Sequence, residues 1–193
     1  AEFRNQRLGL GARDDGVAHF DRHDQRECAA SPWRARDLDL AAEQLREEIL
    51  EGLLFIATED EVVGQVNGLS VLEIGEFSFG HPSRITARTF MGDDGVLHIE
   101  RETDMSLPDH DKGVLTLNAY LGGTYAQHQP LSLNASLTFE QIYVYVDGDS
   151  ASSSELYALL SSLSLIPIRQ GISVTGSVNQ RGEIQPIGSV NEK

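Results

Sequence analysis

The spacing of hydrophobic residues changes from helical to strand-like near residue 52. From Asp37 to Gly52, apolar residues recur every three or four positions with Glu and Arg between them, which predicts an amphipathic helix that ends at the glycine. The following runs are short and alternating or β-branched, and turn-forming residues separate them, as is typical of strands: 53–57, 61–66, 69–74, 84–90 and 95–101. The expected turns are Asn67-Gly68, Gly80-His81-Pro82 and Asp93-Asp94-Gly95. This part of the chain predicts a mostly antiparallel sheet.

The second half of the chain alternates between the two patterns. Helical spacing returns around Val114 and stops near Gly122-Gly123, and strand-like runs follow at 131–139, 143–146, 172–176 and 183–187. Between them, a helix is predicted from Ser150 to about Ser164, with a capping box S-x-x-E at residues 152–155. The mixture predicts an α+β fold, or a mixed α/β fold, in which a few helices pack on mostly antiparallel sheets.

Residues 1–36 show neither period. They hold seven of the thirteen arginines, scattered among Asp, His and Gly, without an apolar face. We therefore predict a tail or linker over 1–36 and one domain over 37–193.

Composition narrows the functional class. The formal charge is −15, from 30 acidic and 15 basic residues, and such a field repels phosphate groups, so neither nucleic acid nor an anionic membrane surface is an expected partner. Cys28 is the single cysteine, which excludes an internal disulfide. No apolar run approaches the ~20 residues that span a bilayer, and no signal-peptide pattern opens the chain, so we expect a soluble, cytoplasmic protein.

The tripeptide Gly148-Asp149-Ser150 suggests a hydrolase nucleophile, and the surrounding residues separate three versions of it. A nucleophile elbow needs a later histidine, but no histidine follows His128. A chymotrypsin-like G-D-S-G-G motif needs two glycines where Ala151-Ser152 stands. A Ser/Lys dyad needs no histidine, only a lysine that burial keeps partly neutral.

Lys112 and Lys193 are the two lysines, and Lys193 follows a predicted hairpin that could return it to Ser150. Amides at the start of the helix after Ser150 would favour an oxyanion. Spacing alone leaves a plainer interpretation open, in which Asp149 and Ser152 are helix caps and Lys193 is a solvated lysine.

Eight blocks of the chain follow a known pattern: VGQVNGLSV (63–71), PSRITAR (82–88), IERE (99–102), KGVL (112–115), PLSLNASLTFEQ (130–141), DGDSASS (147–153), PIRQ (167–170) and VTGSVNQRGEIQPIGSVNEK (174–193). In order and at the family spacing, they resemble Lon proteolytic domains (peptidase family S16), most closely those of the LonB-like branch, which includes Lon protease homologs. The resemblance covers nearly all of residues 40–193.

The resemblance implies a role for each matching residue. The nucleophile falls on Ser150 and the general base on Lys193, while Thr175 matches the residue whose hydroxyl holds that lysine. From residues alone, Thr175 is an ordinary strand residue and Glu102 a solvated one. The supporting residues that the resemblance implies are Thr175, Asp147, Gly148, Asp149 and Glu102.

The resemblance also implies a serine endopeptidase that degrades unfolded or damaged proteins in a homo-oligomeric, hexameric ring driven by an ATPase. No G-x-x-x-x-G-K-[ST] motif occurs, so ATP and Mg²⁺ are expected only on a separate AAA+ module, and this chain should bind no cofactor. Family members continue beyond the catalytic lysine, so a missing C-terminal part and an inactive fragment are expected. The alternative is a non-proteolytic Lon-fold scaffold, or a peptide-binding or oligomerisation module.

Histidine-rich positions offer weaker candidates. His19 and His23, with Asp21 and Asp24, have a spacing that suits a metal, but they lie in a stretch without the apolar pattern that a rigid site needs. His110, between two aspartates, is predicted to lie in a polar loop. No metal site is therefore expected.

Overall fold

A five-stranded mixed sheet forms the framework of the fold, in the order β4-β5-β3-β2-β7. The computed structural model describes residues 32–74 and 77–193. The β2-β3 and β3-β5 pairs are antiparallel, whereas the β4-β5 and β2-β7 pairs are parallel. The helices and strands are α1 (Pro32–Leu50), β1 (Glu61–Val62), β2 (Gln65–Ile74), β3 (Phe77–Phe90), β4 (Gly95–His98), α2 (Ile99–Glu102), α3 (Pro108–Tyr125), β5 (Asn134–Phe139), α4 (Ser152–Ser164), β6 (Ile168–Arg169), β7 (Ser173–Val174), β8 (Ser177–Val178) and β9 (Ile184–Gln185).

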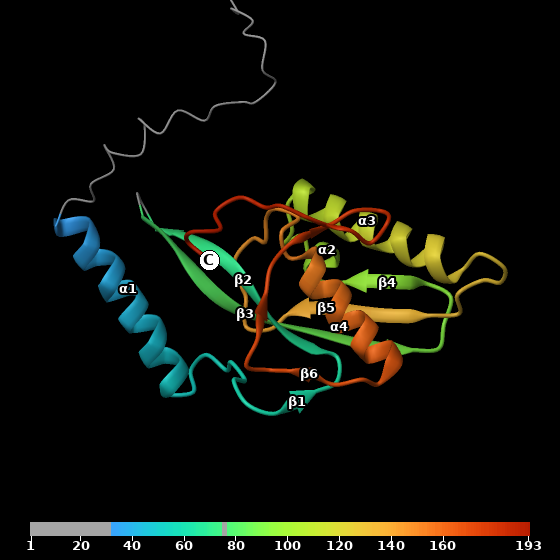
Figure 1. Ribbon diagram of the computed structural model, residues 1–193, viewed down its shortest axis with the longest axis horizontal. Helices are drawn as coiled ribbons and strands as arrows, with labels where there is room; N and C mark the ends of the chain where they lie inside the picture. Colours follow the sequence, from blue (N-terminus) through green and yellow to red (C-terminus); the bar gives the residue numbers. More distant parts are fainter. Residues whose placement is uncertain (1–31, 75–76) are drawn as a thin grey trace, which may run out of the picture.

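Helices α3 and α4 supply the second layer, and the fold is α+β as expected. Alternate residues of the central strands point to one face, where Ile85, Ala135 and Leu137 are buried against Leu117 of α3 and Leu159 of α4. Helix α1 lies apart from these helices, beside the far end of β2 and β3 (Figure 1). The core therefore sits between the sheet and α3-α4, immediately behind the loop that carries Ser150.

Two predicted turns are wrong, because β2 and β3 are long, continuous strands. Gly68 lies within β2, where an added Cβ would come 2.8 Å from Ile85 Cδ1, so this glycine serves close packing instead of a turn. Pro82 lies opposite Leu69, in the half of β3 whose only described neighbour is β2. A strand tolerates proline on an unpaired edge.

Several predicted boundaries also differ. Residues 53–57 and 143–146 form no strand, and the run at 61–66 is broken at Gly64, whose φ of +73° turns the chain between β1 and β2. The run at 95–101 changes into α2 after His98. Helix α1 begins at Pro32, within the stretch predicted as tail, because proline suits a first helical turn even without an apolar period.

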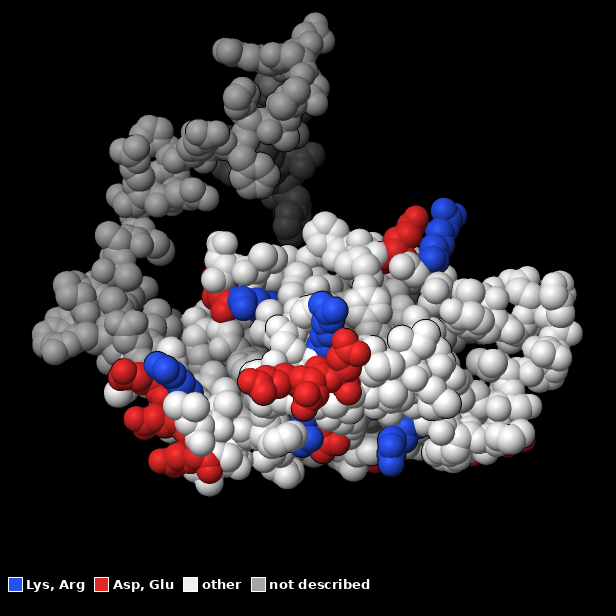
Figure 2. Space-filling view, turned by 60° about the horizontal axis from the view of Figure 1, so that its bottom comes forward, with Lys and Arg blue, Asp and Glu red and all other residues white. Residues whose placement is uncertain are grey.

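Charges on one face of the surface stand in small separate groups, with uncharged surface between them (Figure 2). Between β6 and β1, the exposed side chains of Arg169 and Glu61 form an ion pair, with Arg169 Nε 3.3 Å from Glu61 Oε1.

Among the described residues, no helix combines the length and the apolar character that crossing a bilayer requires.

We expect Leu137→Ala to lower the free energy of unfolding by about 2–5 kcal/mol, because this side chain is fully buried and its loss leaves a cavity. Leu53→Ala is the control, since Leu53 is 66% exposed and should change stability by less than about 0.5 kcal/mol. Urea unfolding followed by circular dichroism measures both. Equal effects of the two substitutions would contradict the assigned core.

Candidate active site

Ser150 lies in a turn that two hydrogen bonds fasten to the loop after β7. Its carbonyl oxygen accepts from the Gly176 amide at 2.7 Å and from Thr175 Oγ1 at 3.2 Å. Gly176 in turn accepts from the Ser153 amide at 3.0 Å. Gly148, with a φ of +75°, lets the chain turn sharply just before the serine. The backbone position of Ser150 is therefore set by contacts between segments 25 residues apart.

Lys193 reaches the serine from the other side. Its Nζ lies 2.9 Å from Ser150 Oγ and 3.2 Å from Thr175 Oγ1. The β8-β9 hairpin reverses the chain at residues 179–182, so the predicted return toward Ser150 is what the structure has. Three side-chain groups that are far apart in the sequence thus meet within hydrogen-bonding distance.

Gly80 in β3 makes room for this arrangement. A Cβ at Gly80 would overlap the Glu192 carbonyl oxygen and lie 3.2 Å from Lys193 Cα. The sequence pattern predicts a turn at Gly80 and gives no sign that Glu192 and Lys193 pack against it. The glycine permits the close backbone approach that brings the lysine alongside the sheet.

The surroundings of Lys193 favour its neutral form. Burial lowers the pKa of the amine, and the charge of Asp149 opposes that effect without cancelling it, so the pKa lies below the ordinary lysine value. Asp149 itself accepts a hydrogen bond from Ser177 Oγ at 2.7 Å. An amine of lowered pKa beside a hydroxyl is the arrangement that general-base activation of serine requires.

The amides available for an oxyanion differ from those first expected. The Ser152 and Ser153 amides, at the start of α4, already donate to Asp149 O and Gly176 O. Within the part of the chain that the structure describes, the amides of Ser150 and Ala151 donate to no acceptor. These two N–H groups are the better candidates to meet developing negative charge.

The predicted capping box is wrong. Ala151 occupies the N-cap position without a side-chain cap, and Ser152 lies inside α4, where its Oγ donates to Asp149 O at 2.8 Å. Glu155 does not turn back to the helix start, because its carboxylate faces His98. The S-x-x-E pattern does not reveal this outcome, because His98, the residue that competes for the Glu155 carboxylate, lies far away in the sequence, at the end of β4.

A cavity of about 550 Å³ opens beside Ser150 and Lys193. Its walls are residues 68–72 of β2, residues 144–151 and residues 186–189. The apolar run at 143–146, predicted as a strand, contributes Val144 and Tyr145 to this wall, although both side chains are more than half exposed. Consecutive residues of β2, from Gly68 to Leu72, line one side of the cavity.

The supporting residues predicted from the sequence divide into two groups. Asp147, Gly148 and Asp149 line the cavity, and Asp147 Oδ1 accepts from the Gly148 amide at 2.7 Å. Glu102 lies at the end of α2, is exposed and is not among the residues that line the cavity. Thr175 does not line the cavity either, but its Oγ1 contacts Ser150 O and Lys193 Nζ, whereas no hydrogen bond among the described residues joins the Glu102 side chain to the site. His19 and His23 lie outside the described residues.

Known proteins resemble the chain as follows. Residues 141–193 match the family model of the Lon protease (S16) C-terminal proteolytic domain. A putative Lon protease homolog of Escherichia coli (strain K12) is 45% identical over 163 residues, which are 83% of this chain and 27% of that protein. A putative Lon protease homolog of Haemophilus influenzae is 39% identical over 153 residues, 78% of this chain and 26% of that protein. An archaeal Lon protease of Pyrococcus abyssi is 34% identical over 140 residues, 72% of this chain and 13% of that protein.

The chain thus spans about a quarter of the length of the first two relatives and less of the third.

We expect the Lys193 amine to titrate below the ordinary lysine pKa of about 10.4, because burial disfavours its charged form. Amine labelling across a pH series, followed by mass spectrometry of the peptides, measures the midpoint. Lys112, exposed on α3, reports that the reagent remains active at each pH. A Lys193 midpoint at or above 10.4 would contradict the proposed environment.

Proposed function

Because the chain belongs to the Lon protease (S16) family, within its proteolytic domain, we propose that it is a serine endopeptidase in which Ser150 is the nucleophile and Lys193 the general base. The observation that carries the proposal is the 2.9 Å separation of Lys193 Nζ and Ser150 Oγ in a half-buried setting that lowers the lysine pKa. Nucleophile and base within hydrogen-bonding reach, with a third group orienting the base, is the arrangement that activates a serine.

The proposed reaction is acyl transfer in two steps. Neutral Lys193 takes the proton of Ser150 Oγ, the oxygen attacks a peptide carbonyl carbon, and the amides of Ser150 and Ala151 stabilise the oxyanion. The C–N bond then breaks, and the lysine ammonium returns the proton to the leaving amine. Water, deprotonated by the same lysine, hydrolyses the ester and releases Ser150.

Strand β2 offers a place for the substrate backbone. Among the described residues, β7 pairs with β2 at Asn67 and Gly68 alone, so no described strand covers the outer backbone edge of residues 69–72 along the cavity. An extended polypeptide can pair with such an edge through main-chain hydrogen bonds, which require no particular side chain. This supports unfolded polypeptide as the substrate class, since most extended backbone in a folded chain is already paired or buried.

The proposal also concerns assembly and the supply of energy. The chain spans about a quarter of the length of its bacterial relatives, and the resemblance implies that ATP and Mg²⁺ bind to an AAA+ module separate from these 193 residues. We propose that copies of this domain form a homo-oligomeric ring, hexameric in the family, around a chamber that receives unfolded chains.

We expect Ser150→Ala, made in a chain extended past Lys193, to reduce cleavage of an unfolded polypeptide by at least roughly 1,000-fold, because the nucleophile is lost. The matched control is Ser164→Ala, at the exposed end of the same helix, which should leave the rate unchanged. Fluorescence release from a labelled unfolded protein measures turnover, and mass spectrometry after treatment with an activated ester detects the acyl-serine directly. Equal activity, or equal acylation, of wild type and Ser150→Ala would leave the non-proteolytic scaffold as the better explanation.

We expect Thr175→Val to lower kcat roughly 10- to 100-fold with little change in KM, because Thr175 Oγ1 positions the lysine amine and does not line the cavity. Thr175→Ser keeps the hydroxyl and should restore most of kcat. The pH dependence of kcat supplies the second measurement, since a displaced lysine should change its midpoint. A threonine that serves only in packing would show the opposite order, with valine better tolerated than serine.

A further inference from the structure

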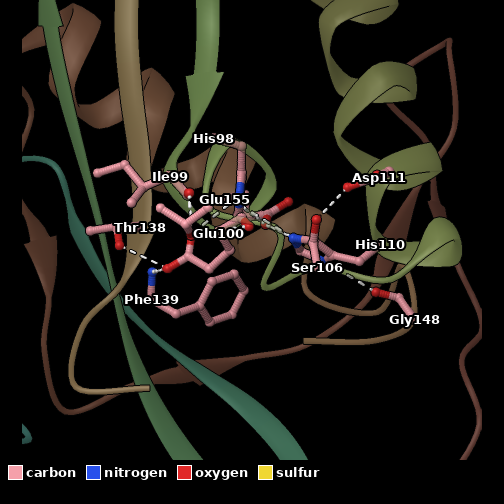
Figure 3. A network of polar contacts seen from close by, with 11 residues as sticks. His98, Ile99, Glu100, Ser106, His110, Asp111, Thr138, Phe139, Gly148 and Glu155 are labelled. Carbon is pink, nitrogen blue, oxygen red and sulfur yellow. Dashed lines mark hydrogen bonds and ion pairs between the residues drawn. The ribbon is translucent and has the colours of Figure 1, made fainter. Parts of the chain in front are cut away.

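A second polar cluster lies buried behind the Ser150 turn. Figure 3 shows its members converging from three elements: His98 from the end of β4, His110 from α3 and Glu155 from α4. Each is at most 1% exposed. The Phe139 ring packs against both imidazoles, with centroid distances of 5.9 and 5.6 Å. The prediction of a polar loop at His110 is therefore wrong, because the residue lies within α3 and faces the interior.

The cluster brings three electron-pair donors to one point. His98 Nε2 lies 2.9 Å and His110 Nε2 3.4 Å from the same oxygen, Glu155 Oε1. The two imidazole nitrogens are 3.3 Å apart. Glu155 Oε2 is also buried and has no hydrogen-bond partner among the described residues.

The outer nitrogen of His110 fixes which atom of that ring carries the lone pair. His110 Nδ1 lies 3.3 Å from the Gly148 carbonyl oxygen, which can only accept, so Nδ1 carries the proton and the lone pair of the neutral ring is on Nε2. His98 Nδ1 faces Glu100 Oε2 at 3.1 Å, although the angle does not make a hydrogen bond. With the His98 proton on Nδ1 as well, toward Glu100, two lone pairs and a carboxylate face one another in a dry site, and either a metal ion or a shared proton between them offsets the cost of that arrangement.

We propose that His98, His110 and Glu155 bind one divalent transition-metal ion, for which Zn²⁺ has the best-matched donor preferences. Zinc at about 2.0–2.1 Å from tetrahedral nitrogen and oxygen ligands places those ligands about 3.3–3.4 Å apart. The three separations here, 2.9, 3.3 and 3.4 Å, are close to that geometry. Glu155 Oε2, which has no hydrogen-bond partner among the described residues, could add a second contact from the same carboxylate.

The outer contacts suit a metal site as well. Metal-bound histidines usually direct their second nitrogen to a carboxylate or a backbone carbonyl, which orients the ring. His98 has Glu100 in that position and His110 has Gly148. Glu100 is itself held by Thr138 Oγ1 and the Phe139 amide, both at 2.8 Å.

An ion in this site would be structural. It would join β4, α3 and α4, and through His110 it would hold the Gly148 carbonyl, two residues before Ser150. The competing occupant is a single proton, which would leave His98 as an imidazolium. Burial alone lowers the His98 pKa, but Glu155, Glu100 and Asp111 together raise it above the ordinary value, so the experiment must separate metal from proton.

The test measures zinc bound by the purified chain. After removal of metal with a chelator, titration with Zn²⁺ against a chromophoric competitor should give one tight equivalent, and elemental analysis of the dialysed protein should give one ion per chain. His110→Gln and Glu155→Gln should weaken zinc binding at least roughly 10- to 100-fold, whereas His128→Gln and the double variant His19→Gln/His23→Gln should leave it unchanged.

Wild-type spectra make the test independent of how the variants fold. Co²⁺ in the same site should show the visible absorption of a tetrahedral complex, and zinc should raise the Tm of the wild-type chain. A wild-type chain that takes up no zinc, or zinc that is lost in His19→Gln/His23→Gln, would overturn the proposal and leave the shared proton as the occupant. Neither readout uses peptidase activity, so the metal site and the Ser150 dyad can fail separately.

Discussion

The hydrogen bond between the Lys193 amine and the Ser150 hydroxyl is the contact on which the rest of the site depends. It requires an amine withdrawn from water, because a fully solvated lysine would remain protonated and could not accept the serine proton. Partial burial lowers the pKa of the Lys193 amine toward that condition, and Thr175 Oγ1 adds a second fixed point for the amine. The same threonine donates to the Ser150 carbonyl, so the Ser150 backbone and the Lys193 amine share one anchor.

Helix α4 connects this site to the buried histidines. Ser150 stands just before the helix and Glu155 lies about one turn into it, so both sites depend on how the helix start is held. Four consecutive polar residues, Ser152 to Glu155, are buried there, and the side chains of three of them, Ser152, Ser154 and Glu155, have partners on β8, β7 and β4. Burying these polar groups lowers stability unless their hydrogen-bond partners are present. The position of the Ser150 turn therefore depends on how β4, α3 and β7 pack around the start of α4.

Close approaches of backbone explain the glycines that sequence analysis placed in turns. Gly68 brings Ile85 against β2, and Gly80 admits the chain beside Lys193. In both cases the missing side chain makes room for an atom from a distant segment. A turn and a close contact both favour glycine, and the sequence around the residue does not distinguish between them.

The sequence by itself determined the elements with strong periodicity, the α+β class and the family, because these depend on local spacing and on motifs that are contiguous in the chain. It also singled out Ser150 and Lys193, although their roles stay predictions. Only the tertiary structure decided that β2 and β3 continue through Asn67-Gly68 and Pro82, that Glu102 stands apart, and that His98, His110 and Glu155 meet. These outcomes depend on which atoms from distant segments pack against a residue. Local sequence patterns allow several partners, and the partner that is buried beside the residue in the folded chain makes the contact.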